Sequence, residues 1–364
     1  DFPHFSELAK EQQPEAKLQG QPVLLLNARL VPSHTVYKQL KEIVNAGKTC
    51  LVKHGQSIAA AFVAADAVPP PFPADVTALE EYLSGTLANF AEQSPLELPL
   101  FDYPHDVVRH HLTILAENLA HRISGGKYRE IADGVFVAVG AKLGEHYVAD
   151  TKNGPIILDE QASVGPHSFL RGPAYLGPFA KVIEQSAIKD GVALGHTTKI
   201  GGEVEASIVE PYTNKQHYGF LGHSYLGSWI NLGAGTCNSD LKNTYGIVKM
   251  DYRAEQVSTG MQFVGCMMGD YAKSAIQTGI FTGKTIGVGS MLYGFVTTNV
   301  PSFVNYARLF GQVTELSPEV LVSTQQRMFS RRNVVQRPCD IQLIHAMYEL
   351  TRHERQLAGE PLSL

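Results

Sequence analysis

Cysteine and long apolar runs are both scarce in this sequence. Among 364 residues there are four cysteines, Cys50, Cys237, Cys266 and Cys339, and no two of them form a CxxC pair. This spacing argues against a zinc ribbon and fits a reducing compartment, so we expect a cytoplasmic protein. No stretch approaches ~18 uninterrupted apolar residues, and no signal peptide is recognisable. The sequence therefore predicts no membrane-spanning helix and no membrane partner.

Concentrated positive charge is also missing. The chain has 30 Lys and Arg residues against 35 Asp and Glu residues, which gives a net charge of −5 at pH 7. Without a long basic run, nucleic acid is excluded as the main partner. The length allows two domains and a large core.

What the sequence does contain is a period of six. Four residues after each member of an aliphatic series stands a small or β-branched residue. The aliphatic series is Leu158, Val164, Leu170, Leu176, Val182, Ile188, Leu194 and Ile200. The second series is Ala162, Ser168, Ala174, Ala180, Ser186, Val192, Thr198 and Val204. A helix repeats at 3.6 residues and a strand at two, so neither alone explains this pattern. A hexapeptide β-solenoid with three short strands per turn does explain it.

The fold class is therefore predicted as mainly β, with a left-handed parallel β-helix over residues 151–305. Residues 1–150 read as an α/β domain and residues 306–364 as a helical tail that caps the exposed strand edges. The expected strands are 22–31 and 49–63, and the expected helices are 36–46, 75–92, 106–123 and 317–356, the last broken at Pro338. About 18 residues per turn gives roughly eight coils.

The period of six breaks twice, at residues 206–219 and 238–260, and we expect loops there. Function in a solenoid usually resides in such loops. The first break contains His217, beside Lys215. A histidine is a reasonable general base because its unperturbed pKa of ~6.5 suits proton transfer near neutral pH.

The segment that follows resembles the acetyltransferase half of the bifunctional enzymes that make UDP-N-acetylglucosamine. The matching residues are His217, Leu221, Gly222, Gly227, Asn231 and Gly233-Ala234-Gly235-Thr236, in register and without a gap. Glu203 stands fourteen residues before His217, as in that family. The fuller pattern, GGEVEASIV…NKQHYGFLG…LGAGT…SDLKN, resembles a divergent bacterial GlmU-like branch. Its short nucleotidyltransferase-like N-terminal domain is matched by Leu26–Leu30 and Tyr103–Asp106.

This resemblance implies an N-acetyltransferase that uses acetyl-CoA and an amino-sugar phosphate. His217 would take a proton from the sugar's 2-amino group, Glu203 would orient the sugar or the base, and Asn231 would bind substrate. The implied phosphate-site residues are Lys215, Lys242, Lys189, Arg171 and Tyr245. The implied coenzyme contacts are Gly233, Ala234 and Gly235, whose amides are candidates for holding the oxyanion, together with Cys266, Ser274, Thr278 and Ser290.

Two departures from the family pattern leave the acceptor open. Phe220 replaces a tyrosine, and Glu205 replaces a lysine in the phosphate site. The N-terminal half also lacks, in residues 1–60, the Gly-rich loop that would cradle a triphosphate. Nucleotidyl transfer, which would need UTP and Mg²⁺, therefore stays an alternative activity.

Other interpretations remain open at this point. One is a zinc-dependent, carbonic-anhydrase-like solenoid enzyme that uses His196, His217 and His223. Another is a nucleotidyltransferase with a vestigial acetyl site, and a third is a binding solenoid without turnover. Because the faces of a three-sided prism pack about a threefold axis, we expect a homotrimer with active sites between subunits.

Overall fold

The computed structural model describes residues 20–68, 76–89, 91–252 and 255–357. The chain forms two compact units, residues 1–104 and 105–364. Among the described residues, no helix is long and apolar enough to cross a bilayer.

The first unit is a small α/β domain. Its sheet has the order β1-β3-β2-β4, antiparallel except for the β2–β4 pair. The strands are β1 (Val23–Leu26), β2 (Cys50–His54), β3 (Ser57–Val63) and β4 (Glu92–Gln93), and the helical segments are α2 (His34–Ala46), η1 (Ala65–Ala67), α3 (Val76–Glu81), η2 (Tyr82–Thr86) and η3 (Leu87–Asn89).

Apolar side chains cover both faces of this sheet. Val36 and Ile43 of α2 pack against Val52 and Phe62 in one cluster. In the other cluster, Tyr82 and Leu87 pack with Leu51, Ala61 and Val63. The α/β class predicted for the N-terminal part is therefore correct.

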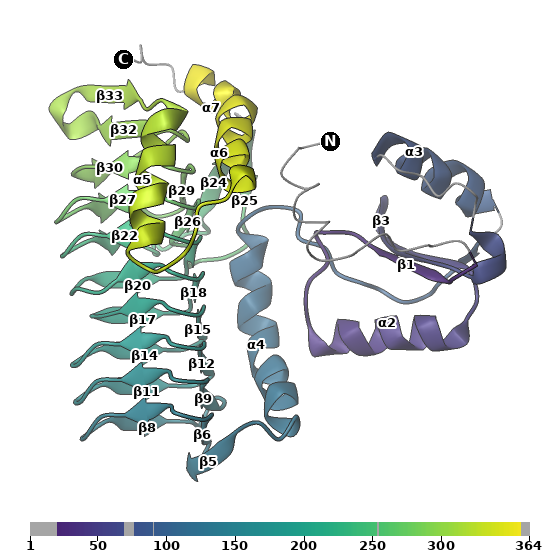
Figure 1. Ribbon diagram of the computed structural model, residues 1–364, viewed down its shortest axis with the longest axis horizontal. Coiled ribbons are helices and arrows are strands. Elements are labelled where there is room, and N and C mark those ends of the chain that lie inside the picture. Colours follow the sequence, from purple (N-terminus) through teal and green to yellow (C-terminus); the bar gives the residue numbers. More distant parts are fainter. Residues whose placement is uncertain (1–19, 69–75, 90, 253–254, 358–364) are drawn as a thin grey trace. The chain divides into compact units, whose positions relative to one another are not determined.

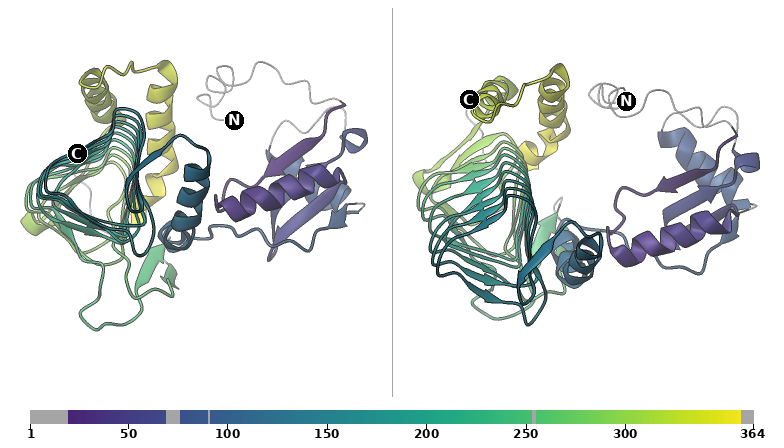
Figure 2. Two further views of the ribbon diagram at one scale, coloured as in Figure 1. Left: turned by 90° about the horizontal axis from the view of Figure 1, so that it is seen from below. Right: turned by 60° about the horizontal axis from the view of Figure 1, so that its bottom comes forward.

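The second unit is a parallel β-helix with three faces, whose triangular section is visible end-on in Figure 2. It confirms the predicted left-handed β-helix class. The first face contains β6 (Val135–Val137), β9 (Ile156–Leu158), β12 (Ala174–Leu176), β15 (Val192–Leu194), β18 (Ile208–Val209), β21 (Tyr225–Leu226), β26 (Cys266–Met268) and β29 (Lys284–Ile286), with β5 (Arg129–Ala132) antiparallel at its start.

The second face contains β7 (Lys142–Leu143), β10 (Ser163–Val164), β13 (Lys181–Val182), β16 (Lys199–Ile200), β19 (Asn214–Lys215), β22 (Asn231–Leu232), β27 (Lys273–Ser274), β30 (Met291–Leu292) and β32 (Val304–Ala307), with β33 (Gln312–Glu315) antiparallel at its end. The third face contains β8 (Val148–Asp150), β11 (Phe169–Arg171), β14 (Ala187–Lys189), β17 (Glu203–Glu205) and β20 (Phe220–Gly222), followed by β23 (Cys237–Asn238), β28 (Gly279–Ile280) and β31 (Phe295–Val296).

The period of six arises from the way these strands stack. Leu158, Leu176 and Leu194 are direct partners on successive rungs, and all three are fully buried in the solenoid core. Each rung here takes eighteen residues, and adjacent rungs are ~4.8 Å apart. We name the corners by the faces they join: the 1–2 edge, the 2–3 edge and the 3–1 edge.

The predicted boundary at residue 150 differs from the structure. Val137, Leu143 and Ala149 already follow the period of six, and the hexads then shift across a three-residue turn at 152–154. The helix expected at 106–123 is α4 (Asp106–Ser124), and it belongs to the second unit. There it packs on the first face, where Leu115 and Leu119 contact Ile157.

The first expected loop is wrong. Residues 206–219 continue the solenoid as a shortened rung with β18 and β19 in place. Ile200 pairs with Lys215, fifteen residues later, so the inward position of this rung is held by a lysine. The sequence pattern failed here because the rung is short and its inward residue is charged.

The second expected loop is present as an excursion over residues 239–265. It carries a hairpin of β24 (Lys249–Tyr252) and β25 (Glu255–Ser258). Val248 and Met250 of this excursion pack with Val108 of α4 and with Met267. The excursion is therefore anchored to the first face.

The C-terminal tail begins later than residue 306, because β32, η4 (Arg308–Phe310) and β33 still extend the solenoid. The helices are α5 (Pro318–Ser330), α6 (Pro338–Leu350) and α7 (Arg352–Leu357), and α6 starts at the predicted break. They close the last rungs through Phe303, Leu321 and Ile344. Figure 1 shows that α5 also runs down beside the solenoid.

Candidate active site

The 2–3 edge brings His217 and Glu203 to neighbouring rungs. His217 lies in the corner between β19 and β20, and its exposed ring has no hydrogen-bond partner among the described residues. Glu203 begins β17 on the rung below and pairs with Phe220, three residues after His217. The two residues selected by the family motif therefore share one edge of the prism.

Glu203 belongs to an ion cluster on the third face. Lys189 Nζ lies 2.6 Å from Glu203 Oε1 and 3.0 Å from Glu205 Oε2. The hydrogen bond to Glu203 raises the pKa of Lys189 above its ordinary value. Glu205 stands where the family has a lysine, and its negative charge is balanced by Lys189. Lys189 therefore already binds two carboxylates.

Tight backbone contacts fix the corner that carries His217. A Cβ on Gly201 would lie 2.1 Å from the Gln216 carbonyl oxygen, so only glycine fits beneath this corner. Above it, the amide of Gly235 donates to the Tyr218 carbonyl oxygen at 3.0 Å. The Tyr218 hydroxyl also hydrogen-bonds Gln277.

Lys215 does not reach a phosphate site. Its side chain is 2% exposed and points into the solenoid, where Nζ donates to the carbonyl oxygens of Gly201 at 2.6 Å and His217 at 3.2 Å. Burial lowers the pKa of Lys215 to about 8. The prediction of a phosphate-binding role for this lysine is wrong, because its register places it inward.

The other predicted phosphate-site residues lie elsewhere. Arg171 is on the third face, 3.3 Å from Asp150 and 3.2 Å from Asp190, and is balanced by these two carboxylates. In the excursion Tyr245 is exposed and Lys242 is half-buried, and Lys242 Nζ donates to the Ile247 carbonyl oxygen. The described contacts join none of the three to His217.

Asn231 and the Gly233–Gly235 corner lie one rung above His217. Asn231 is exposed on the second face, directly above Asn214. The amide of Gly233 donates to the Ser274 carbonyl oxygen at 3.1 Å, and the amide of Gly235 is used as described above. In the described part of the chain, Ala234 N–H is the amide of this corner left without an intrachain acceptor, and it is the candidate donor for an oxyanion.

Four predicted coenzyme contacts are wrong because they lie inside the prism. The exposed fractions are 0% for Cys266, 8% for Ser274, 1% for Thr278 and 0% for Ser290. Their hydroxyl groups satisfy backbone and neighbouring polar atoms, as when Ser290 Oγ donates to the Pro301 carbonyl oxygen at 2.7 Å. Burial raises the pKa of the Cys266 thiol to about 11. These are the small inward residues that the repeat itself requires.

The three histidines of the zinc interpretation lie apart within one chain. His196 lies on the 1–2 edge, His217 on the 2–3 edge and His223 on the 3–1 edge, so each occupies a different corner of the prism. No group of three metal-ligating side chains is found among the described residues.

One acid–base pair was missed by the sequence reasoning. His223 Nδ1 lies 2.8 Å from Asp240 Oδ2, with both side chains about 15% exposed (15% and 14%), and the Phe263 ring stacks on the imidazole at 5.1 Å. Gly222 leaves room for this carboxylate, since a Cβ there would lie 2.3 Å from Asp240 Oδ2. No periodic signal reveals the pair, because Asp240 and Phe263 are brought to His223 by the two ends of the excursion.

Comparisons with known proteins give partial matches to bifunctional nucleotidyltransferase/acetyltransferases. No family model matches the sequence. A bifunctional sugar-1-phosphate nucleotidylyltransferase/acetyltransferase from Sulfurisphaera tokodaii is 26% identical over 158 residues, which are 40% of this chain and 37% of the relative. The bifunctional protein GlmU of Methanococcus vannielii is 26% identical over 119 residues, which are 33% of this chain and 28% of that protein.

Over this part of its length the chain is similar to GlmU-like bifunctional proteins. The match spans about a third of the length of these curated relatives. Among solved structures, a UDP-N-acetylglucosamine acyltransferase from Francisella novicida aligns with a TM-score of 0.40 and 15% identity, over 64% of this chain and 79% of that one.

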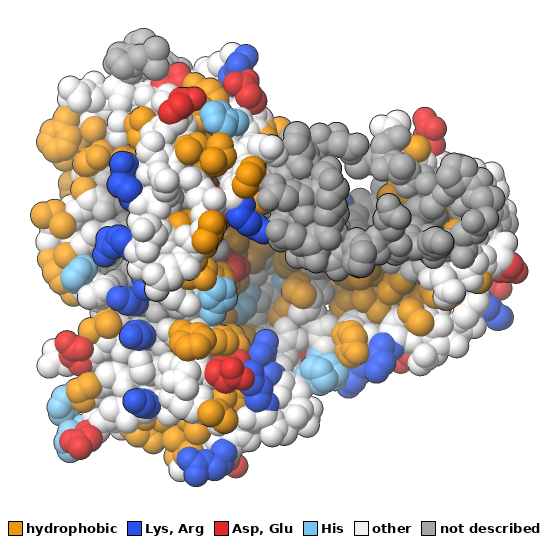
Figure 3. Space-filling model, viewed as in Figure 1, with side chains coloured by type: hydrophobic (Ala, Val, Ile, Leu, Met, Phe, Trp, Pro, Cys, Tyr) orange, Lys and Arg blue, Asp and Glu red, His pale blue; other side chains and the backbone are white. Residues whose placement is uncertain are grey.

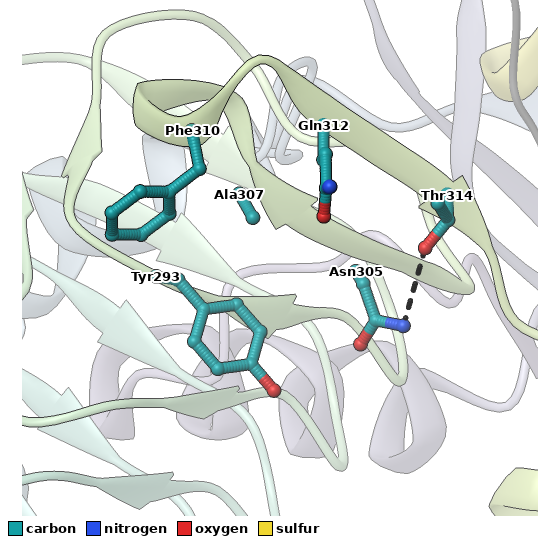
Figure 4. A pocket seen from close by; sticks show the side chains of 6 residues that line it. All are labelled: Tyr293, Asn305, Ala307, Phe310, Gln312 and Thr314. Atoms are coloured by element: carbon teal, nitrogen blue, oxygen red, sulfur yellow. Dashed lines mark hydrogen bonds between the residues drawn. The ribbon is translucent and has the colours of Figure 1, made fainter.

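The solenoid also has an open pocket near its C-terminal end. The volume is about 310 Å³, and the lining residues are Tyr293, Asn305, Ala307, Phe310, Gln312 and Thr314. Figure 4 shows the Tyr293 and Phe310 rings on one side and the Asn305 and Gln312 side chains on the other. Tyr293 follows β30 on the 2–3 edge, the edge that also carries His217. Two aromatic rings facing two amide side chains suit a flat heterocycle.

Proposed function

We propose that this chain is a sugar-phosphate N-acetyltransferase that uses acetyl-CoA. The acceptor is glucosamine-1-phosphate or a related amino sugar. The observation that carries the proposal is that the exposed His217 and Glu203, which pairs with Phe220, lie on adjacent rungs of the 2–3 edge. The GlmU-like relatives, whose names include acetyltransferase, support the same reaction.

In this reaction the sugar's amine nitrogen attacks the thioester carbonyl carbon. His217 takes the proton that the amine loses, acting as general base. Collapse of the tetrahedral adduct breaks the C–S bond, and the departing thiolate recovers the proton from the imidazolium. The free Ala234 amide is the proposed donor to the oxyanion, a contribution of roughly 3 kcal/mol where such donors have been measured.

The amino sugar would bind beside the ion cluster around Glu203. Glu203 is 46% exposed, and Lys189 binds one of its oxygens. Its carboxylate supplies an acceptor for sugar hydroxyls or for the substrate ammonium group. Asn231 adds an exposed amide one rung higher. The sugar phosphate would draw on Lys242 and Tyr245 of the excursion, since Lys215 is inside the prism.

Acetyl-CoA would lie along the 2–3 edge with its adenine in the Tyr293–Phe310 pocket. Hydrogen-bond register aligns Gln216, Gly233, Ala275 and Tyr293 on consecutive rungs. Three rung spacings amount to roughly 14 Å. A pantetheine arm, similar in length to about four extended residues, also spans roughly 14 Å. The length of this arm therefore matches the rise from the corner of His217 to the rung of Tyr293, and the diphosphate and ribose of the coenzyme extend it further before the adenine.

We also propose a cytoplasmic homotrimer. In Figure 3, Lys and Arg side chains line up along the β-helix. On the second face Lys142, Lys181 and Lys199 point outward without an acidic partner among the described residues, and burial together with Arg332 and Lys181 lowers the pKa of Lys199. The third face carries Asp150, Asp190, Glu203 and Glu205 against Arg171 and Lys189. Opposite charges on two adjoining faces favour a closed ring of three chains.

Product analysis tests the function. The chain is incubated with glucosamine-1-phosphate, acetyl-CoA, UTP and Mg²⁺, and both free thiol and pyrophosphate are measured. Thiol release that depends on the amino sugar is the expected result. Pyrophosphate release without thiol release would instead identify a nucleotidyltransferase, an activity supported by the names of the bifunctional relatives. Absence of both products with every amino-sugar phosphate tried would contradict the proposal.

A further inference from the structure

Lys215 occupies an inward column that carries an aliphatic side chain on most of its rungs, with Ser274 and Tyr306 as further exceptions higher up. It pairs with Ile200 of the rung below, and its strand β19 lies beneath β22, which ends in Leu232. Ile200 is 0% exposed and Leu232 is 3% exposed, so the lysine stem lies between two apolar layers. A charge in such surroundings is costly unless it is well hydrogen-bonded, so its presence needs a reason.

The reason lies in the carbonyl groups of the 2–3 edge. On the two rungs below, serines three residues further along cap these carbonyls: Ser168 Oγ donates to Gly165 O at 3.0 Å, and Ser186 Oγ donates to Ile183 O at 2.6 Å. On the next rung the corresponding carbonyl belongs to Gly201, and the residue three positions later is Val204. Val204 has no hydroxyl to donate.

Lys215 supplies the missing donor from the rung above. Its Nζ donates to Gly201 O at 2.6 Å and, in addition, to His217 O at 3.2 Å. Ser168 Oγ also reaches Ile183 O of the next rung at 3.3 Å, so caps of both kinds join successive corners, and in Lys215 the joining group is a charged ammonium. No carboxylate lies within ion-pair distance of it among the described residues, although the charge of Glu203 and the Cys237 thiol favour its protonated form.

We infer that Lys215 is a positioning residue, whose ammonium group fixes the backbone from which His217 projects by binding the carbonyl oxygens of Gly201 and His217 together. This inference rests on the proposed function, in which His217 is the base. It explains why the shortened rung carries a lysine at an inward position. Effective general base catalysis needs the imidazole held within hydrogen-bond reach of the amine, and loss of a fixed corner removes that alignment.

The test compares Lys215→Met with Ser186→Ala. The methionine keeps the length and apolar stem of lysine but cannot donate, and Ser186→Ala removes a cap on the rung below Gly201, away from His217. We expect Lys215→Met to lower kcat at least tenfold with the KM for the sugar within twofold, and its melting temperature to equal or exceed that of the wild type. Ser186→Ala should keep kcat within twofold.

A second readout separates positioning from general stability. Removing a nearby positive charge raises the pKa of an imidazole, so the acid limb of the kcat–pH profile should move to higher pH in Lys215→Met. If Lys215→Met folds poorly, the measurement is repeated with Lys215→Ile, because isoleucine is the residue at the paired position Ile200 on the rung below.

The outcomes distinguish the inference from the proposed function. If His217→Ala abolishes turnover while both Lys215 variants keep the wild-type kcat and pH profile, the positioning role is refuted and the function stands. If His217→Ala keeps the full rate, the base assignment fails and the positioning role fails with it.

Discussion

The rungs between Ile156 and Ile200 and the rungs above Gly201 use the same scaffold under different rules. In the lower group each rung takes eighteen residues and every inward position on the strands is aliphatic. In the upper group, rungs of fifteen and seventeen residues appear, Lys215 and Ser274 point inward, and an excursion leaves after β23. In the first group the residue at each position suits both its strand and the apolar core. In the second group some residues, such as the inward Lys215, do not suit the core, as is expected near a functional site.

The hydrogen-bond partners of the corners show the same contrast. Hydroxyl groups of Ser168 and Ser186 satisfy the lower 2–3 edge, and Ser168 also reaches the Ile183 carbonyl oxygen on the next rung. The upper corners use charged side chains, as in the contacts of Lys215 with Gly201 and of His223 with Asp240. Neutral caps therefore fix the lower corners, and charged groups fix the upper ones.

Replacing a histidine in each group gives the largest expected difference. His217→Ala should reduce acetyl transfer by ~10²–10⁴, the usual loss on removing a general base. The matched control is His196→Ala, on the 1–2 edge of the regular group, which should keep the wild-type rate. Steady-state thiol release measures both. Equal rates for His217→Ala and wild type would show that the upper corner does not carry the base.

A core truncation probes the lower group. Leu194→Ala removes a fully buried side chain from the regular column and should lower the free energy of unfolding by about 2–5 kcal/mol. Because Leu194 lies on the first face, away from the 2–3 edge that carries Glu203 and His217, kcat/KM below the unfolding transition should stay within twofold. Urea unfolding and thiol release check the two halves of this expectation. A large loss of kcat/KM with little loss of stability would contradict the proposal that the lower rungs mainly stabilise the fold.

Sequence reasoning was accurate for the regular lower rungs and failed for the irregular upper rungs. The hexads from Leu158 to Ile200 predicted the fold because each inward residue is aliphatic and each rung has the same length. The inward turn of Lys215 escaped the pattern, since a shortened rung changes which residue faces the core. Cys266, Ser274, Thr278 and Ser290 were assigned to a coenzyme groove because spacing alone does not say which side of a strand a small residue faces.

The sequence predicted only those site residues that belong to one linear motif. Glu203 and His217 lie on adjacent rungs because fourteen residues nearly complete one short rung. Asp240 and His223 pair through an excursion whose path no periodicity describes. The ionic partner of Glu203, Lys189, is likewise set by rung stacking rather than by any spacing in the motif.

The buried lysine predicts an unusual pH dependence of stability. The pKa of Lys215 is about 8 in the folded chain, below its value of ~10.4 in an unfolded chain. Between these values the unfolded state binds more protons, so stability rises with pH, by at most ~1.4 kcal/mol per pH unit from this group. Below pH 8 the full cost of the buried charge is present.

Comparison with Lys215→Met isolates this effect. Other groups that titrate above pH 8, including Lys273, are common to both proteins and cancel in the difference. The stability advantage of the methionine variant over wild type should therefore shrink as pH rises from 8 to 10. Chemical denaturation at four pH values measures it. A constant difference across this range would mean that Lys215 keeps its ordinary pKa.

The smallest expected effect concerns the aromatic pocket, at the far end of the upper group. Phe310 is 68% exposed and lies beside Tyr293, so Phe310→Ala should cost little stability. Stacking of a base on an aromatic ring contributes ~1–3 kcal/mol, and for a ring as exposed as Phe310 we expect the low end of this range, so the KM for acetyl-CoA should rise about five- to tenfold. With acetyl-pantetheine, which lacks adenine, the variant and the wild type should have the same KM. Val335→Ala, an equally exposed apolar truncation outside the pocket, serves as the control. A rise in KM of the same size for both acyl donors would place the adenine elsewhere, because the lost contact would then involve the arm that the two donors share.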